Sequence, residues 1–143
     1  MSVKTPMIYC LEADQIPAAQ TSIDKSCTIP HHSSFTIEYV SGRFTCNASE
    51  NIEVGIKSDH NGYADATPSQ TYLFYPTKAP VSYQPDMVVQ TLSERVWIPV
   101  SAAISGNLTF SAARHAASAT PPGSTGTWSV HLEVHGYLMD LSS

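Results

Sequence analysis

Three residues that can bind a metal or exchange protons occupy every second position near the end of the chain: His131, Glu133 and His135. In an extended strand, such residues share one face, here the face opposite an apolar row. Imidazole and carboxylate groups are ligands that zinc and other transition metals accept. Along a strand, however, His131 and His135 would lie about 13 Å apart, which is too far for both to bind one ion. We therefore expect a polar face and no metal.

A zinc site in this region would need a ligand from elsewhere in the chain. His131 and Glu133 would be about 6.6 Å apart along the strand, as would Glu133 and His135, so either pair could bind an ion together with a third residue. The third ligands that the sequence offers are His115, His31 and His32. Zinc therefore remains the alternative to a purely polar face.

A second group of ligand-type residues surrounds Gly62, between Asp59 and Asp65. Calcium prefers the oxygen ligands that this segment supplies. The segment lacks the third oxygen position before the glycine and the terminal glutamate of the helix-loop-helix calcium site. Calcium is a further alternative, and the sequence predicts no cofactor.

Motifs for nucleophilic catalysis and phosphate binding are missing from the sequence. It has no Gly-x-Ser-x-Gly elbow, no catalytic signature around a cysteine and no glycine-rich phosphate loop. We expect Cys10, Cys27 and Cys46 to be small buried residues, with a disulfide between Cys27 and Cys46 as the alternative. The sequence therefore supports no catalytic residue.

Aromatic side chains indicate a different kind of site. Tyr63, Tyr75, Tyr83 and Trp97 lie near turns or on the strand face opposite an apolar row, and Asn61 adds an amide close to Tyr63. Flat aromatic rings stack on sugar rings, and nearby hydroxyl and amide groups can bind the sugar hydroxyls. The alternative is that these aromatic residues fill the core or an interface. We expect them to bind a glycan or another cell-surface ligand.

The composition of the 143-residue chain argues against two classes of partner. Seven Lys and Arg against twelve Asp and Glu give a net charge of −5, which predicts no nucleic-acid partner. No apolar run approaches the roughly 20 residues of a membrane helix, which predicts no membrane insertion. Only 13% of the residues are charged, and 19 Ser and 13 Thr supply much of the polarity. Because charge is also depleted at oligomer interfaces, we expect a homo-oligomer.

The N-terminus lacks the long apolar segment and the small-residue cleavage site of a secretory signal. We therefore expect either a cytoplasmic protein or a secreted one whose leader is absent from this chain. Three cysteines do not decide between these compartments, because an odd number cannot pair completely.

Strands are the elements that must position these residues. Apolar and polar residues alternate in five segments separated by turn signals, and the helical period is almost absent. The segments are 35–40, 52–57, 96–100, 107–111 and 128–135. The pattern predicts one all-β domain over residues 1–143, a jelly-roll-like antiparallel β-sandwich with eight or nine strands.

Two segments give specific expectations about faces. Alternation over 35–40 places Phe35, Ile37 and Tyr39 together on one face of a strand. The segment Tyr72–Tyr75 is apolar on both faces, which predicts a central strand of the sandwich or a strand covered by another subunit.

Three short segments resemble a group of known proteins. Thr28-Ile-Pro30 precedes Phe35-Thr-Ile-Glu-Tyr-Val-Ser-Gly42, and the last strand ends in Gly136-Tyr-Leu-Met-Asp140. The pattern resembles small, mostly uncharacterised bacterial β-sandwich proteins, in which an Ile/Val-Pro start leads to an IEYVSG-like strand and the C-terminal strand ends similarly. The resemblance implies a β-sandwich and assigns no catalytic residue.

The sequence therefore predicts a non-enzymatic, lectin-like binding or assembly module with a carbohydrate or cell-surface ligand. The alternative is a small metal-dependent enzyme of cupin-like barrel type that uses the histidines. Such an enzyme requires three histidines to converge inside the barrel, whereas the alternation places them outside or on loops.

Overall fold

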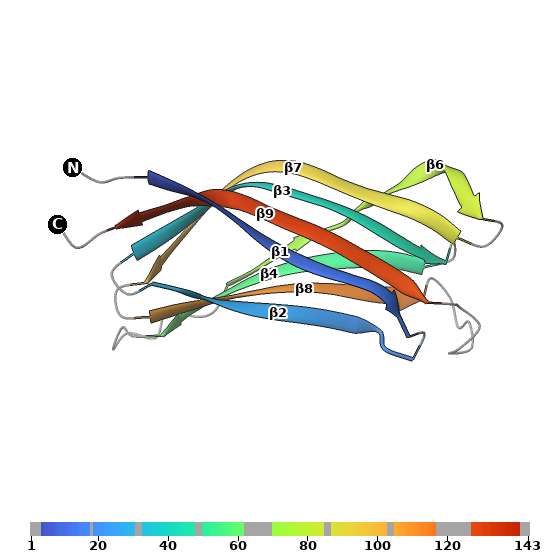
Figure 1. Ribbon diagram of the computed structural model, residues 1–143, viewed down its shortest axis with the longest axis horizontal. Coiled ribbons are helices and arrows are strands. Elements are labelled where there is room, and N and C mark those ends of the chain that lie inside the picture. Colours follow the sequence, from blue (N-terminus) through green and yellow to red (C-terminus); the bar gives the residue numbers. More distant parts are fainter. Residues whose placement is uncertain are drawn as a thin grey trace.

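The computed structural model describes residues 4–17, 19–30, 33–47, 50–61, 70–84, 87–102, 105–116 and 127–140. These residues form nine β-strands in two antiparallel sheets (Figure 1). The strands are β1 (Lys4–Ile16), β2 (Ser22–Ile29), β3 (Ser33–Asn47), β4 (Glu50–Asn61), β5 (Gln70–Phe74), β6 (Thr77–Gln84), β7 (Met87–Ala102), β8 (Ser105–Ala116) and β9 (Trp128–Asp140). No helix of the described residues is long and apolar enough to cross a membrane.

The strand order identifies the type of sandwich. One sheet has the order β1-β9-β3-β7-β6, and the other has the order β2-β8-β4-β5. Strands pair from the ends of the chain inward: β1 with β9, β2 with β8, β3 with β7 and β4 with β5. A long hairpin rolled up in this way is the jelly roll, and β6 adds one strand beside β7. The predicted jelly-roll β-sandwich is confirmed.

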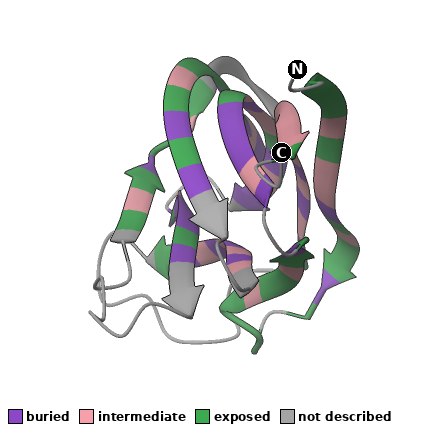
Figure 2. Cartoon of the chain, turned by 90° about the vertical axis from the view of Figure 1, so that its left-hand side faces the viewer, coloured by how far each residue is buried: buried purple, intermediate pink, exposed green. Residues whose placement is uncertain are grey.

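The core lies between the two sheets, and β9 shows how the alternation produces it. Its inner residues are at most 1% exposed, while the side chains of His131 and Glu133 on the outer face are 46% and 34% exposed. Bands of buried and exposed residues alternate along the strands in the same way in Figure 2. The inner residues of β9 are Trp128, Val130, Leu132 and Val134. The predicted faces of this strand are therefore confirmed.

One end of the core contains a buried polar network. The amide nitrogen of Gln90 donates to the Glu50 carbonyl oxygen and to the Cys46 sulfur, both at 3.1 Å. The amide oxygen of Gln90 accepts from the Ile52 backbone N–H at 3.3 Å. Arg114 Nε lies 2.8 Å from Glu50 Oε2, and both side chains are 4% exposed. Burial and the nearby Glu50 carboxylate raise the pKa of the Cys46 thiol to about 11, so this buried thiol stays neutral near pH 7.

The three cysteines are free thiols. Cys46 is buried on β3, whereas Cys10 and Cys27 are partly buried on β1 and β2. Cys27 and Cys46 lie in different sheets, and no disulfide joins them. The alternative of a Cys27–Cys46 disulfide is therefore wrong.

The alternation fails on β3, at a β-bulge. On β3, one residue, Glu38, separates Ile37 from Tyr39. The residues that pair with Ile37 and Tyr39 are adjacent on β9, and two residues separate them on β7. An extra residue of this kind reverses the faces of the strand that follows it. Phe35 and Ile37 are buried as predicted, but Tyr39 points outward and Val40 takes the inner position. The expectation that Tyr39 shares a face with Phe35 and Ile37 was wrong, because it assumed a regular register.

Gly136 on β9 lies beside this bulge. A Cβ atom at this position would lie 2.1 Å from the Thr36 carbonyl oxygen and 2.9 Å from the Phe35 ring. The β9 backbone can approach β3 this closely because glycine has no side chain.

The position of β5 also differs from the expectation. Among the described strands, it is an edge strand of the four-stranded sheet and not a central strand. Phe74 is buried and Tyr72 packs against the core, while Leu73 is 49% exposed and Tyr75 is 63% exposed. The expectation of a central strand was therefore wrong, and coverage by another subunit stays a prediction.

Candidate functional site

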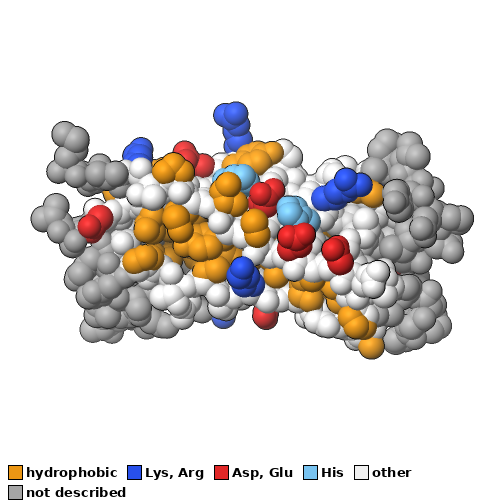
Figure 3. All heavy atoms as spheres, viewed as in Figure 1, with side chains coloured by type: hydrophobic (Ala, Val, Ile, Leu, Met, Phe, Trp, Pro, Cys, Tyr) orange, Lys and Arg blue, Asp and Glu red, His pale blue; other side chains and the backbone are white. Residues whose placement is uncertain are grey.

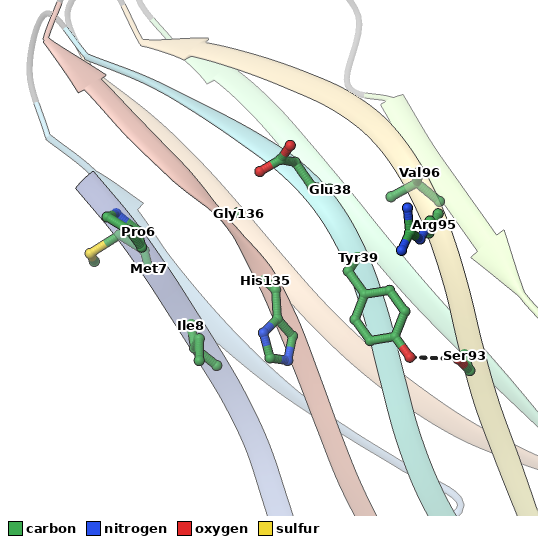
Figure 4. A pocket seen from close by; sticks show the side chains of 10 residues that line it. All are labelled: Pro6, Met7, Ile8, Glu38, Tyr39, Ser93, Arg95, Val96, His135 and Gly136. Atoms are coloured by element: carbon green, nitrogen blue, oxygen red, sulfur yellow. Dashed lines mark hydrogen bonds between the residues drawn. The ribbon is translucent and has the colours of Figure 1, made fainter. Parts of the chain in front are cut away.

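A shallow groove lies over the bulge, on the outer face of the five-stranded sheet. Its volume is about 990 Å³, and ten residues of β1, β3, β7 and β9 line it (Figure 4). The register of these four strands places their outward side chains in rows across the sheet. The row under the groove consists of Ile8, His135, Tyr39 and Arg95.

Two further rows continue this face beyond the groove. The first consists of Cys10, Glu133, Ser41 and Ser93, and the second of Glu12, His131, Arg43 and Thr91. Figure 3 shows histidine and acidic side chains close together over this sheet. Hydroxyl, imidazole, carboxylate and guanidinium groups thus lie on one continuous surface.

Tyr39 occupies the middle of the groove. Its hydroxyl is hydrogen-bonded to the hydroxyl of Ser93 on β7, and its ring meets the ring of His135 edge-on, with 5.6 Å between the centroids (Figure 4). These two contacts hold the aromatic ring on the surface. The bulge is the reason that this ring is available outside the core.

The walls of the groove differ in character. Pro6 and Ile8 of β1 form an apolar wall, and Ile8 is 55% exposed. Glu38 and Arg95 bring opposite charges to the other side, where β3 and β7 carry the bulge. Neither of these two side chains makes an ion pair with another described residue. Their hydrogen-bonding groups can therefore serve a ligand.

The His131, Glu133 and His135 ladder runs from the groove along β9. Glu133 lies between the two rings, 3.5 Å from His131 Nε2 and 3.9 Å from His135 Nε2. The other ring nitrogen of His131 lies 3.7 Å from a carboxylate oxygen of Glu12 on β1. These side chains are 34–62% exposed, so the contacts between them contribute little to stability.

The described residues do not assemble the zinc alternative. His115 lies on β8 of the other sheet, 3.9 Å from Glu53, and cannot be a third ligand for the β9 residues. His31 and His32 lie outside the described residues. In the part of the chain that the structure describes, no three His, Cys, Asp or Glu side chains gather as a metal site needs. Of the predicted calcium ligands, Asp65 lies outside the described residues. Only the backbone of Asp59 is described.

The predicted aromatic ligand residues are not brought together. Trp97 is 70% exposed on β7, next to the bulge, while Tyr75 follows β5 at the edge of the other sheet. Tyr63 lies outside the described residues. Asn61 ends β4 and Tyr83 lies in β6, and their side chains are not described.

Sequence reasoning missed the groove residues Tyr39, Arg95, Ser93 and Ile8. Tyr39 was expected on the same face as Phe35 and Ile37, because the pattern gives no sign of a bulge at Glu38. The other three are ordinary outward residues of strands, and they become neighbours through the register of distant segments. The one available signal was Gly136 inside a strand, since such a glycine often marks a bulge or a close backbone approach.

Comparisons with known proteins give no family for this chain. No family model matches it, and no curated protein matches it. A solved structure, the enzymatically active domain of tailspike protein 4 of bacteriophage CBA120, aligns with 95% of this chain at 12% identity and a TM-score of 0.32. The chain spans 19% of the length of that tailspike chain. A likeness at this level carries no argument, and the resemblance to bacterial β-sandwich proteins stays a prediction.

Proposed function

We propose that this chain is a non-enzymatic binding module that holds a carbohydrate of a cell surface in the groove over the β3 bulge. The observation that carries the proposal is the placement of Tyr39, an aromatic residue held outside the core. It lies between an apolar wall and the side chains of Glu38 and Arg95, which make no ion pair with another described residue. Binding sites for small ligands combine apolar contact with a few convergent polar groups in this way.

The chemistry of a sugar matches the two sides of the groove. A pyranose ring has an apolar face of C–H groups, which packs on aromatic and aliphatic side chains such as Tyr39 and Ile8. Its hydroxyl groups both donate and accept hydrogen bonds. Arg95 can donate to them, Glu38 can accept from them, and the exposed hydroxyl of Ser93 can do either.

The groove is open, so much of a bound sugar would stay in water. We expect a dissociation constant on the order of 0.1–1 mM for a single site. The Trp97 side chain, next to the bulge on the same face, offers a second aromatic surface for a longer oligosaccharide.

The proposal is tested by screening the full chain on an array of neutral and acidic oligosaccharides and titrating the best binder by calorimetry. Arg95→Ala and Tyr39→Ala should each weaken binding at least tenfold. Lys57→Ala is the matched control, because Lys57 is an exposed cation on the regular four-stranded sheet. It should leave the dissociation constant within about twofold of the wild-type value, within ordinary surface-substitution effects.

Two outcomes would overturn the proposal. One is an array on which no oligosaccharide binds above background at any protein concentration. The other is a binder whose affinity falls with Lys57→Ala and not with Arg95→Ala or Tyr39→Ala.

A further inference from the structure

Two edge strands lie side by side on one flank of the molecule. Within the described part of the chain, β1 is an edge of the five-stranded sheet and β2 an edge of the four-stranded sheet (Figure 1). Hydrophobic side chains gather between them (Figure 3). Met7, Tyr9, Ile23 and Cys27 pack against the core but are only partly buried. An unpaired strand beside an apolar strip can be completed by another chain.

Two observations fix which backbone groups of β1 face this open edge. Lys25 Nζ on β2 donates to the Cys10 carbonyl oxygen at 3.1 Å, so this carbonyl points away from β9. The N–H and C=O of one residue point to the same side of a strand, and the side alternates along the strand. The even-numbered residues from 4 to 12 therefore present their backbone groups to the open edge. Pro6 is among them, and an open edge is where a sheet tolerates the missing N–H of proline.

We propose that two copies of this chain pair through β1, antiparallel, about a two-fold axis at Ile8. In this register, Ile8 faces the partner's Ile8, Pro6 faces the partner's Cys10, and Lys4 faces the partner's Glu12. The two five-stranded sheets then form one continuous sheet. The inference concerns the assembly of the chain and does not depend on the proposed ligand.

The backbone hydrogen bonds select this register. Pro6 cannot donate, so the carbonyl opposite it must find another donor. In the proposed register, the carbonyl opposite Pro6 is that of the partner's Cys10. The partner's Lys25 already donates a hydrogen bond to this carbonyl. A register shifted by two residues would place Pro6 opposite a carbonyl to which no lysine donates in this way. It would also bring a backbone N–H to the carbonyl that Lys25 occupies.

The side chains fit the same register. Ile8 is 55% exposed in the single chain and would contact its copy side by side at the axis. Lys4 and Glu12 are both exposed, and each would face an opposite charge across the strands, twice by symmetry. On the inner side, Met7 would face the partner's Tyr9 and extend the apolar strip.

The size of the contact sets the expected affinity. A strand edge of this length buries less than the standard interface of about 1,600 Å², so we expect a dissociation constant on the order of micromolar. Because Ile8 also lines the groove, the two grooves would lie on either side of the axis. If the proposed function holds, this arrangement would strengthen binding to a surface that displays many copies of the ligand.

The proposal is tested by sedimentation velocity of the full chain from about 1 to about 500 µM, a range that brackets a micromolar dissociation constant. The mass should rise from 15.5 kDa toward twice that value. Ile8→Lys should weaken the dimer at least tenfold, because two ammonium groups would meet at the axis. Leu73→Lys is the matched control: Leu73 is 49% exposed on the β5 edge strand, and its replacement should leave the dimer unchanged.

A charge exchange tests the register itself. Lys4→Glu should weaken the dimer, and Lys4→Glu combined with Glu12→Lys should restore it. Circular dichroism of each variant checks folding, and the two charge positions are exposed, so this arm stands even if Ile8→Lys fails to fold. A mass of 15.5 kDa at every concentration would overturn the proposal. A dimer that is sensitive to Leu73→Lys and insensitive to Ile8→Lys and Lys4→Glu would overturn it as well.

Discussion

The two sheets of this sandwich share one core but differ in regularity. In the four-stranded sheet, the β2–β8, β4–β8 and β4–β5 pairings run without a register shift. In the five-stranded sheet, all four pairings contain at least one shift. Among the described residues, the register shifts are therefore confined to the five-stranded sheet, and this sheet carries the groove.

The outer faces of the two sheets use their polar groups differently. On the four-stranded sheet, polar side chains pair across the strands: the hydroxyls of Ser26 and Thr109 lie 2.9 Å apart, and the Thr28 hydroxyl donates to the Asn107 amide oxygen at 3.3 Å. At the groove of the five-stranded sheet, Arg95 makes no ion pair with a described residue. Hydroxyls pair on both sheets, since Tyr39 is hydrogen-bonded to Ser93 in the groove. Beside the bulge, the five-stranded sheet also presents the Arg95 guanidinium group, which a ligand can use.

The first test compares one buried leucine in each sheet, because we expect the register shifts to leave the packing of the shared core unaffected. Leu132 on the five-stranded sheet and Leu108 on the four-stranded sheet are both 0% exposed. Leu132→Ala and Leu108→Ala should each lower the free energy of unfolding by about 2–5 kcal/mol, because both leave a cavity in one shared core. His131→Ala, on the outer face, should cost less than about 1 kcal/mol. Urea unfolding measures all three, and equal losses at His131 and Leu132 would show that the faces of β9 are assigned wrongly.

The second test compares one glycine in each sheet. A Cβ at Gly136 would meet backbone, the Thr36 carbonyl oxygen at 2.1 Å, whereas at Gly55 it would meet the Ser111 hydroxyl at 2.8 Å, which can rotate away. Gly136→Ala should therefore cost about 3 kcal/mol and Gly55→Ala about 1 kcal/mol or less, the range of overpacked sites. Thermal and urea unfolding of the two variants give these values. A larger loss for Gly55→Ala would contradict the close approach of strands at the bulge.

The third test uses alkaline pH and the cysteines of the two sheets. Burial raises the pKa of Cys46 to about 11, so between pH 9 and 11 the unfolded chain loses a proton that the folded chain keeps. Stability should fall over this range, by about 1–2 kcal/mol from this thiol. Cys46→Ala should flatten that slope in urea unfolding at pH 8–11. Cys27→Ala, at the partly buried thiol of β2, should flatten it less; an equal change would contradict the difference in burial.

The sequence allowed the regular part of this molecule to be predicted. Alternation in 128–135 placed Leu132 inside and His131 outside, because β9 keeps a period of two over these residues. The jelly roll followed from short strands without helices, and its topology confirms that expectation. Apolar–polar alternation in a sequence predicts the faces of a strand that keeps a regular register.

The candidate site could not be predicted for the same reason. A single residue, Glu38, reverses the faces of β3 and places Tyr39 on the face opposite to Phe35 and Ile37. The sequence of β3 itself carries no sign of the bulge, and Gly136 on β9 is the one signal of it. The row of Ile8, Tyr39 and Arg95 depends on the register of segments far apart in the chain. The exposed aromatic residues Tyr75 and Trp97 were visible in the sequence, but they lie on different sheets.

The most direct test of the account is an NMR titration of the ¹⁵N-labelled chain with the oligosaccharide selected on the array. If the ligand binds in the groove over the β3 bulge, we expect the amide signals of Tyr39, Ser93, Arg95 and His135 to shift together along one binding curve. Signals from the outer face of the four-stranded sheet, such as Lys57 and Thr109, should stay in place. Shifts centred on β4 and β8, with the groove signals unmoved, would contradict the claim that the bulge of the five-stranded sheet creates the binding site.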